Sequence, residues 1–264
     1  MSDERVALVT GAARGIGAAT VRALVDDGYR VLAVDACLGD DHHLSGVDHA
    51  LASRADLDRL DDLGDDVTTC VVDVSDEYAL GRCAALAVAR LGRLDVAVAA
   101  AAVIAGGRPL WETPAADLAA LWSVDVLGVW NTAAAVVPHM LAGPDPGGCR
   151  FVAVASAASG RGLFHLTGYT TVKHAVVGLV RGLAADLVGT GVTAVAVSPG
   201  ATRTPMLDAT ARIYGLADPA ELAAHQLSRR VHDPAEVAAT IVHCCSRSGG
   251  LLNGSVVEVG GVAG

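Results

Sequence analysis

The chain carries a tyrosine and a lysine four positions apart, Tyr169 and Lys173, in the stretch GYTTVKHAVVGL. On a helix, residues at this spacing share one face. A phenol with a pKa near ~10 is a poor base at neutral pH, but a neighbouring ammonium stabilises the phenolate and lowers its pKa. The pair therefore predicts a tyrosine that exchanges a proton with a substrate oxygen. Ser156, thirteen residues before the tyrosine, is placed to hydrogen-bond the same oxygen. Ordinary amphipathic helices show this spacing too, so the assignment depends on the elements around it.

A glycine-rich turn near the start of the chain offers a place for a phosphate group. Its sequence, TGAARGIGAAT over residues 10–20, follows an apolar strand and opens a helical pattern. Glycine lacks a Cβ atom, so a diphosphate can approach the free N–H groups at the helix N-terminus, where the helix dipole favours an anion. The order of strand, turn and helix predicts a dinucleotide site rather than a tight packing turn. The turn residues expected to contact the nucleotide are Gly11, Arg14, Gly15, Ile16 and Gly17.

The adenosine end of that nucleotide is addressed by Asp35, which ends the second predicted strand. A carboxylate there can accept both hydrogen bonds from a ribose and would repel a 2′-phosphate. Arg14 favours the opposite choice, because it could bind that phosphate. We therefore expect NAD, with NADP less favoured. Asp73 and Val74 end the third predicted strand at the same edge, where they would contact the adenine.

Seven short, valine-rich runs alternate with helical patterns and show no polar alternation. Such runs predict a parallel sheet with helices on both faces, and right-handed crossovers make it a doubly wound, Rossmann-type α/β fold. No linker or composition shift divides the chain, so residues 1–264 are expected to form a single domain. The predicted strands are 5–10, 29–35, 66–74, 94–100, 149–156, 192–200 and 255–259.

Composition and charge argue against several classes of partner. The formal net charge of −10 would repel nucleic acid and anionic membranes. The six cysteines show no CxxC spacing, which indicates free thiols in a reducing cytoplasm. We expect no signal peptide, and we expect apolar runs such as 94–105 to be too short or too interrupted to span a bilayer. These features predict a soluble, cytoplasmic protein.

In this order, the motifs TGAARGIG, the strand-terminal Asp35, Ser156, YTTVK and SPGATRT (198–204) resemble the short-chain dehydrogenase/reductase family. The resemblance covers nearly the whole chain and implies an oxidoreductase acting on CH–OH groups. It implies that Tyr169 is the acid–base, that Lys173 grips the nicotinamide ribose and lowers the tyrosine pKa, and that Ser156 orients the alcohol or carbonyl. It places further residues around the cofactor, namely Ala99, Ala101, Pro199, Gly200, Thr202 and Thr204.

A narrower likeness appears in RVALVTGAARGIGAATVRALVDDGYRVLAVD, AAVIAGGRPLWET, FVAVASAASGRGLFHL and KHAVVGLVRGLAADL. These stretches are similar to the mycofactocin-coupled branch of the family. That likeness implies extra residues after the second strand, NAD held without exchange, and an external redox carrier (mycofactocin) that reoxidises NADH. By resemblance to related enzymes, helices at 114–141 and 166–188 would pair between subunits of a homotetramer.

The chain departs from the family at two places. Ala99–Ala102 stands where most members have Asn-Asn-Ala-Gly, so the adenine-side wall keeps its backbone and loses its amide side chains. Asp125 stands where the family usually has its fourth catalytic residue, an asparagine that helps to hold a water behind the lysine. A carboxylate can still accept from that water, and it would also attract Lys173 and raise the lysine pKa. Asp125 is therefore kept among the catalytic candidates.

The polar stretch 36–50 must pass over the adenosine end of the groove before the next helix begins. Loops of this length in a compact domain are usually functional or disordered. Its histidines, His42, His43 and His49, lack metal-ligand spacing, so no metal site is predicted. A solvated surface loop and a lid over the cofactor both remain open, and the apolar residues Leu38, Leu44 and Val47 would anchor a lid.

The substrate would lie between Ser156, Tyr169 and the nicotinamide. The segment 204–230 is expected to be mobile and to contact it, and the lining around it is mostly apolar. A small secondary or allylic alcohol, or its carbonyl, is therefore expected. Two alternatives remain, a carrier-bound 3-oxoacyl reductase using NADPH and a regulator that senses NAD without turnover. The substrate residues expected are Val103, Trp111, Phe164, His165 and Met206.

Overall fold

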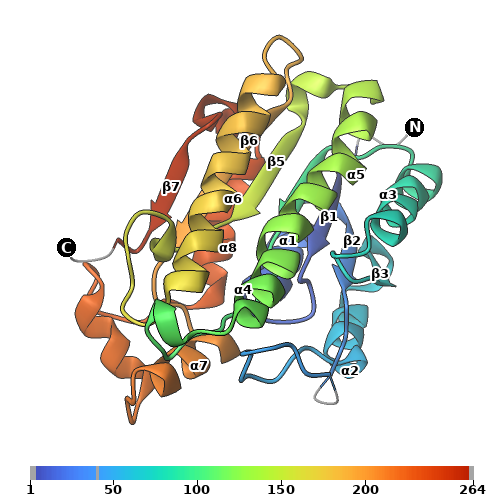
Figure 1. Cartoon of the computed structure of the whole chain (residues 1–264). Helices are drawn as coiled ribbons and strands as arrows, with labels where there is room; N and C mark the ends of the chain where they lie inside the picture. Colours follow the sequence, from blue (N-terminus) through green and yellow to red (C-terminus); the bar gives the residue numbers. More distant parts are fainter. Residues whose placement is uncertain (1–3, 40–41, 262–264) are drawn as a thin grey trace.

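The computed structural model describes residues 4–39 and 42–261 and contains a seven-stranded, all-parallel sheet in the order β3-β2-β1-β4-β5-β6-β7 (Figure 1). Every predicted strand is present, each slightly shorter than its apolar run. The doubly wound α/β fold predicted from the sequence is therefore confirmed. The strands are β1 Val6–Thr10, β2 Arg30–Asp35, β3 Val67–Val71, β4 Val96–Ala99, β5 Arg150–Val154, β6 Thr193–Pro199 and β7 Val256–Val259.

Helices cover both faces of the sheet (Figure 1). On one face, α3 (Glu77–Leu91), α5 (Gly128–Ala142) and α6 (Thr167–Asp186) bury apolar side chains against the strands. On the other, α1 (Gly15–Asp26) and α8 (Pro234–Cys245) do the same. Because strands of a parallel sheet are buried on both faces, they read as continuous apolar runs. This explains why they were recognisable in the sequence.

The order of the sheet reverses between β1 and β4, because β1 pairs with β2 on one side and with β4 on the other. Thr10 aligns with Val34 of β2 and with Ala99 of β4, so the carboxyl ends of these three strands lie at one edge. Ligands of doubly wound sheets bind in the crevice at such a switch point. The fold therefore brings the glycine turn, Asp35 and the alanine tract to one place.

The predicted helix 114–141 is built from three pieces. A short α4 (Ala115–Leu121) runs through one π-helical turn, Trp122–Leu127, into α5. The whole stretch Ala115–Ala142 is long and apolar enough to cross a membrane by length and composition, which corrects the expectation that no segment is. Half of its most apolar window is buried inside the protein, where Val129, Val136 and Met140 join the core. It is a packing helix of the domain.

The segment 204–230 forms ordered secondary structure beside the cavity. It contains α7 (Pro205–Ile213), capped by the Thr204 side chain, and a 3-10 turn at Pro219–His225 capped by Asp218. Leu207 of α7 packs in one small cluster with Leu222 of the turn. The remaining helix, α2 (Arg54–Asp58), follows the inserted loop and continues into a 3-10 stretch, Arg59–Asp66.

Candidate active site

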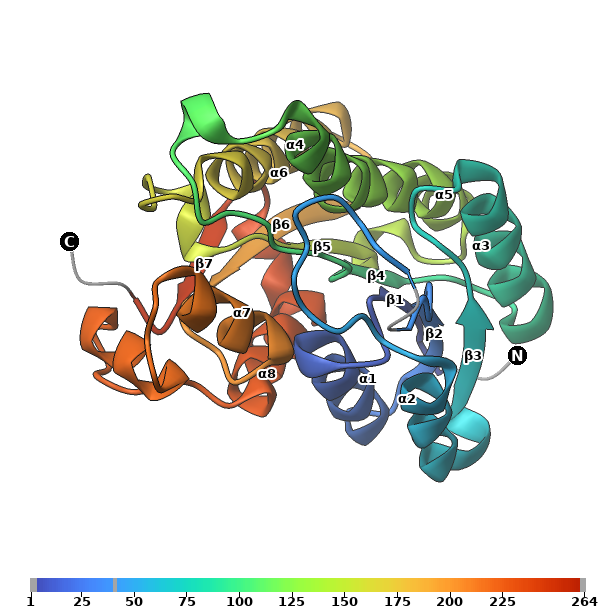
Figure 2. The same ribbon diagram turned by 60° about the horizontal axis from the view of Figure 1, so that its bottom comes forward.

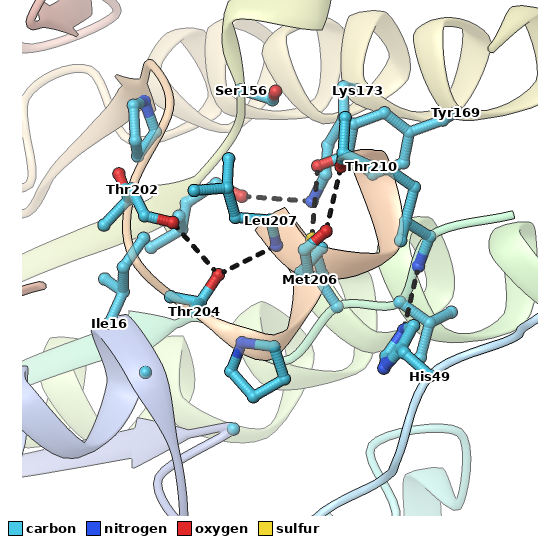
Figure 3. Close-up of a pocket in the computed structure, with 18 of the residues that line it drawn as sticks. Ile16, His49, Ser156, Tyr169, Lys173, Thr202, Thr204, Met206, Leu207 and Thr210 are labelled. Carbon is cyan, nitrogen blue, oxygen red and sulfur yellow. Dashed lines mark hydrogen bonds between the residues drawn. The ribbon is translucent and has the colours of Figure 1, made fainter. Parts of the chain in front are cut away.

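A cavity of about 970 Å³ opens at the carboxyl ends of the strands and extends from the glycine turn to α7. At one end it is lined by the turn, Asp35 and Asp73. Its middle is lined by Ser156, Tyr169 and Lys173, which Figure 3 shows together with Met206. Beyond them the walls are mostly apolar, with Val103, Ile104, Leu163, Leu166, Met206 and Leu207. One continuous space thus joins the predicted nucleotide site to the predicted chemical centre.

The glycine turn leaves no room for side chains. Gly11 has a φ of +65°, and a Cβ atom on it would lie 2.6 Å from the backbone nitrogen of Ala101. A Cβ on Gly17 would lie 1.9 Å from the carbonyl oxygen of Gly11. The backbone of the turn therefore packs directly against the alanine tract after β4, and α1 begins at Gly15 with its N-terminus at the cavity. This is a cradle for an anion.

Charged groups at this end of the cavity are arranged for a ribose rather than a phosphate. The carboxylate of Asp35 accepts hydrogen bonds from the N–H groups of Ala13 (3.1 Å) and Cys37 (3.0 Å) and faces the cavity. Arg14 also lines the cavity, but its guanidinium is bound to the nearly buried Asp56 at 2.6 Å. Although burial opposes its ionisation, bonds from Arg14 and Ser53 hold the pKa of Asp56 below its usual range. Arg14 is therefore committed to that carboxylate.

Tyr169 and Lys173 lie on one face of the first turns of α6, as predicted from their spacing. Both side chains are buried, and the lysine Nζ lies 5.6 Å from the centre of the tyrosine ring. Nζ also donates to the carbonyl of Val154 at 3.4 Å. Ser156 follows β5 at the same edge, where its Oγ accepts a 3.2 Å bond from the N–H of Ala158. The tyrosine hydroxyl lies 3.7 Å from the sulfur of Met206, which also lines the cavity.

Asp125 lies behind the lysine, in the π-helical turn, and is fully buried. Its Oδ1 lies 2.9 Å from Lys173 Nζ, and its Oδ2 accepts a 3.1 Å bond from the N–H of Val103. Burial alone would lower the pKa of Lys173, but the adjacent carboxylate raises it. The attraction predicted from the sequence is therefore present. It keeps the lysine charged and fixes its position.

The pKa of Tyr169 is set by opposing contributions. Burial raises the pKa of the phenol, Lys173 opposes that rise, and Asp125 reinforces it. Lys173 therefore acts on the tyrosine pKa in the expected direction, but burial, the largest cause, outweighs it and leaves the pKa of the phenol raised.

The comparisons with known proteins agree with this geometry. The sequence pattern of the short chain dehydrogenase family matches residues 5–213. The chain belongs to the short-chain dehydrogenase family. It is therefore an oxidoreductase acting on CH–OH groups. The dehydrogenase is 34% identical to the short-chain reductase protein NovJ of Streptomyces niveus, over 99% of this chain and 94% of the relative.

Two carveol dehydrogenases are also similar to this dehydrogenase. The (-)-trans-carveol dehydrogenase of Rhodococcus erythropolis is 32% identical over 80% of this chain and 76% of its own length. The crystal structure of carveol dehydrogenase from Mycobacterium avium in complex with NAD superposes with a TM-score of 0.88. It is 28% identical, and the match covers 97% of this chain and 95% of that one.

Most of the predicted site residues of the dehydrogenase line the cavity, and four do not. Ala99 is buried within β4, and Asp125 is screened by Lys173. Trp111 is 81% exposed and is not among the residues that line the cavity, so its substrate contact stays a prediction. His165 has a φ of +55° and stacks on Phe164, and it too lies outside the lining. The predicted residues that line it are Gly11, Arg14, Gly15, Ile16, Gly17, Asp35, Asp73, Val74, Ala101, Val103, Ser156, Phe164, Tyr169, Lys173, Pro199, Gly200, Thr202, Thr204 and Met206.

The loop after β2 reaches further than predicted. It was expected over the adenosine end, and residues 40–41 lie outside the described residues. The described part extends from Asp35 to the neighbourhood of α4 before returning to α2 (Figure 2). Leu44, Val47 and Leu51 pack in the same apolar cluster as Tyr169. Its histidine His49 lines the cavity, which spacing alone did not reveal.

Other functional candidates appear only in three dimensions. Asn131 donates from Nδ2 to the carbonyl of Val74 at 2.9 Å and so fixes the wall at the third strand. Arg161 and Tyr214 line the far end of the cavity, from segments more than fifty residues apart. Within residues 4–39 and 42–261, no three His, Cys, Asp or Glu side chains gather in a way that could hold a metal ion.

Substituting Gly11 with alanine tests the cradle. We expect the nucleotide affinity of the dehydrogenase to fall at least about tenfold, because the new methyl would collide with the Ala101 backbone and left-handed geometry costs roughly 1–2 kcal/mol. Gly28 is a matched control, since its φ is +84° but a Cβ there meets nothing within 4 Å. Gly28→Ala should lose stability in urea unfolding yet keep its affinity for NADH, measured by fluorescence titration of protein refolded without nucleotide. Equal losses of affinity in both variants would contradict the assignment.

Proposed function

We propose that this dehydrogenase uses NAD to move a hydride between a small apolar alcohol, secondary or allylic, and its carbonyl. The observation that carries the proposal is the single cavity that joins an anion cradle and Asp35 to a buried Tyr169–Lys173 pair with apolar walls beyond. The names of the carveol dehydrogenases are consistent with a substrate of this class. The apolar walls favour such a substrate, because they offer few hydrogen-bonding groups to a more polar molecule.

The choice of NAD over NADP rests on the acidic end of the cavity. Asp35 would accept both ribose hydroxyls and repel a 2′-phosphate. Arg14, which could bind a 2′-phosphate, instead forms a salt bridge with Asp56. The solved carveol dehydrogenase from Mycobacterium avium contains NAD. These points disfavour the alternative of an NADPH-dependent 3-oxoacyl reductase.

The residues of the chain divide the chemistry as follows. NAD, when bound, supplies the hydride acceptor and a positive charge beside the phenol. The phenolate of Tyr169 takes the hydroxyl proton of the alcohol as the C–H hydride leaves. Ser156 Oγ hydrogen-bonds the same oxygen and holds it in place. Lys173, kept charged by Asp125, stabilises the phenolate electrostatically.

We further propose that the loop after β2 holds NAD in place between turnovers, so that an external redox carrier of the mycofactocin type must reoxidise it. Contacts from three sides support this. Ser45 Oγ donates to Asp117 Oδ1 of α4 at 2.7 Å, and Val47 forms an antiparallel bridge with Ala105. Arg212 of α7 donates to the carbonyl of Asp48 at 2.7 Å. A loop fixed this way would have to detach before a dinucleotide could leave.

Protein purified without added nucleotide should therefore carry NAD or NADH. We expect close to one nucleotide per chain after dialysis, released only on denaturation and identified by mass spectrometry as NAD rather than NADP. Added NAD should not support rapid multiple turnover. An empty protein, or one that turns over freely with added NAD, would refute retention. Release of NADP would refute the cofactor choice.

The same purified sample distinguishes the dehydrogenase from the alternative of a non-catalytic NAD sensor. Addition of carveol should reduce the bound NAD in a single turnover, seen as absorbance at 340 nm, whereas a sensor would show no change.

We also propose a homotetramer formed through the helical layer. Exposed apolar side chains on α4 and α5, including Leu118 and Trp130, support it, and light scattering would test it. A cytoplasmic location is proposed because the described cysteines are free thiols, and cell fractionation would check it.

A further inference from the structure

Among the described residues of the loop after β2, one ionisable side chain lines the cavity, His49. Its Nδ1 lies 3.2 Å from the carbonyl of Ala50, so that nitrogen carries the ring proton of the neutral form. Its Nε2 accepts a 3.4 Å hydrogen bond from the N–H of Ile104, as Figure 3 shows. The histidine thus joins the loop to the chain that follows β4.

The segment that His49 binds also holds the catalytic ion pair. The N–H of Val103 donates to Oδ2 of Asp125, while Oδ1 of Asp125 pairs with Lys173. Val103 and Ile104 therefore present successive N–H groups, one to the Asp125 carboxylate and one to the loop. The next residue, Ala105, forms the bridge with Val47. Both sets of contacts position the same three buried residues.

We propose that His49 is a positioning residue, which in its neutral form fastens the loop to residues 103–105 and so couples cofactor retention to the geometry behind Lys173. The proposal rests on the proposed function, because it supplies the fastening of the retaining loop. Protonation of the imidazole makes Nε2 a donor, so it can no longer accept from Ile104. The loop contact is then lost at acid pH.

The surroundings of His49 favour the neutral ring. Burial is the largest cause that lowers its pKa below 6.5, and the Arg212 guanidinium on α7 acts in the same direction. The Ala50 carbonyl, Asp125 behind the cavity wall and Asp48 on the loop oppose the shift. A lowered folded-state pKa means that the stabilisation is complete above the unfolded value. It is lost as pH falls from about 6.5 through the lowered value.

The test measures the dissociation rate of NADH from the full chain. Protein whose bound NAD has been reduced to NADH by carveol is mixed with excess NAD, and the loss of bound-NADH fluorescence is followed over minutes to hours between pH 5.5 and 8. We expect the wild-type rate constant to rise at least about fivefold over that fall in pH. His49→Ala should release NADH at least about tenfold faster than wild type at pH 8, with little further change on acidification.

Two variants distinguish the proposed role of His49, holding the loop to residues 103–105, from a general structural role. His49→Gln keeps an acceptor for Ile104 but cannot be protonated, so it should be slow at pH 8 and remain slow at pH 5.5. His43→Gln changes an exposed histidine of the same loop and should keep the wild-type pH profile. Circular dichroism at each pH verifies that all variants are folded.

The proposal is overturned if His49→Gln keeps the wild-type pH dependence, or if His49→Ala releases NADH at the wild-type rate. These outcomes are independent of whether retention itself is correct. Retention is judged by the absolute wild-type rate at pH 8, whereas the role of His49 is judged by the ratios between variants and pH values.

Discussion

Replacing Tyr169 with phenylalanine should reduce hydride transfer by about 100- to 10,000-fold, the range typical for loss of a general acid–base. The variant removes one hydroxyl from a side chain that is 6% exposed and otherwise packed in the apolar cluster of the cavity. The packing is therefore retained while the proton acceptor is lost. We expect the nucleotide content to stay at the wild-type level, because the ring is kept and the cradle is untouched.

Single-turnover reduction of bound NAD by carveol, followed at 340 nm, measures this loss. Tyr78→Phe is the matched control, since Tyr78 is 79% exposed on α3 and should leave the rate unchanged. A Tyr169→Phe variant that reacts at more than about a tenth of the wild-type rate would rule out the phenol as the proton acceptor. A variant that loses its nucleotide as well would indicate a structural role for the hydroxyl.

Replacing Asp125 with alanine should lower the free energy of unfolding by about 3–5 kcal/mol, because it leaves the Lys173 ammonium buried without its counter-charge. For a chain of this size that corresponds to a fall in Tm of roughly 6–20 °C. Asp125→Asn should cost less, because its amide oxygen can still accept from the N–H of Val103. Urea unfolding and calorimetry measure both effects.

A double variant identifies the ion pair as the cause. Lys173→Met combined with Asp125→Leu removes both charges and replaces them with apolar groups, so it should unfold at higher urea than either single change. Additive losses would show that the two side chains act separately. The pH dependence has a definite sign. Because Asp125 raises the pKa of Lys173, the stabilisation is present below pH 10.5 and is lost as pH rises through the higher folded-state value.

The fold was predictable because its five inner strands, from β2 to β6 in the sheet, are largely buried, whereas the edge strands β3 and β7 are only partly so. Continuous apolar runs of this kind leave few alternatives, and only their ends were placed too far out, where turn residues such as Asp73 and Ser156 continue the run. The Tyr169–Lys173 pair was also predictable, since a helical spacing of four fixes which side chains share a face. Both predictions depend only on residues close together in the sequence, so they hold wherever such residues alone position the site.

Other features of the site could not be predicted, because the direction of a side chain or a distant contact decides them. Trp111 is near the cavity lining in sequence, but the 3-10 turn Leu110–Glu112 points it to solvent. Arg14 was weighed as a phosphate ligand because its partner, Asp56, lies forty-two residues away. His49 was seen only as a loop histidine, because nothing local indicates that the loop crosses to Ile104. Each depends on a tertiary contact that single-sequence patterns do not contain.

The π-helical turn at Trp122–Leu127 sets the phase of a long helix. An α-helix rotates successive residues by about 100°, and one wider turn shifts everything beyond it around the axis. Asp125 can thus face Lys173 while Val129, Val136 and Met140 still face the sheet. Deleting a single residue here would restore a regular helix and turn one of those two faces away. The number of residues in this turn is therefore constrained as tightly as their identity. We expect an insertion or deletion to be tolerated only at the ends of the helix.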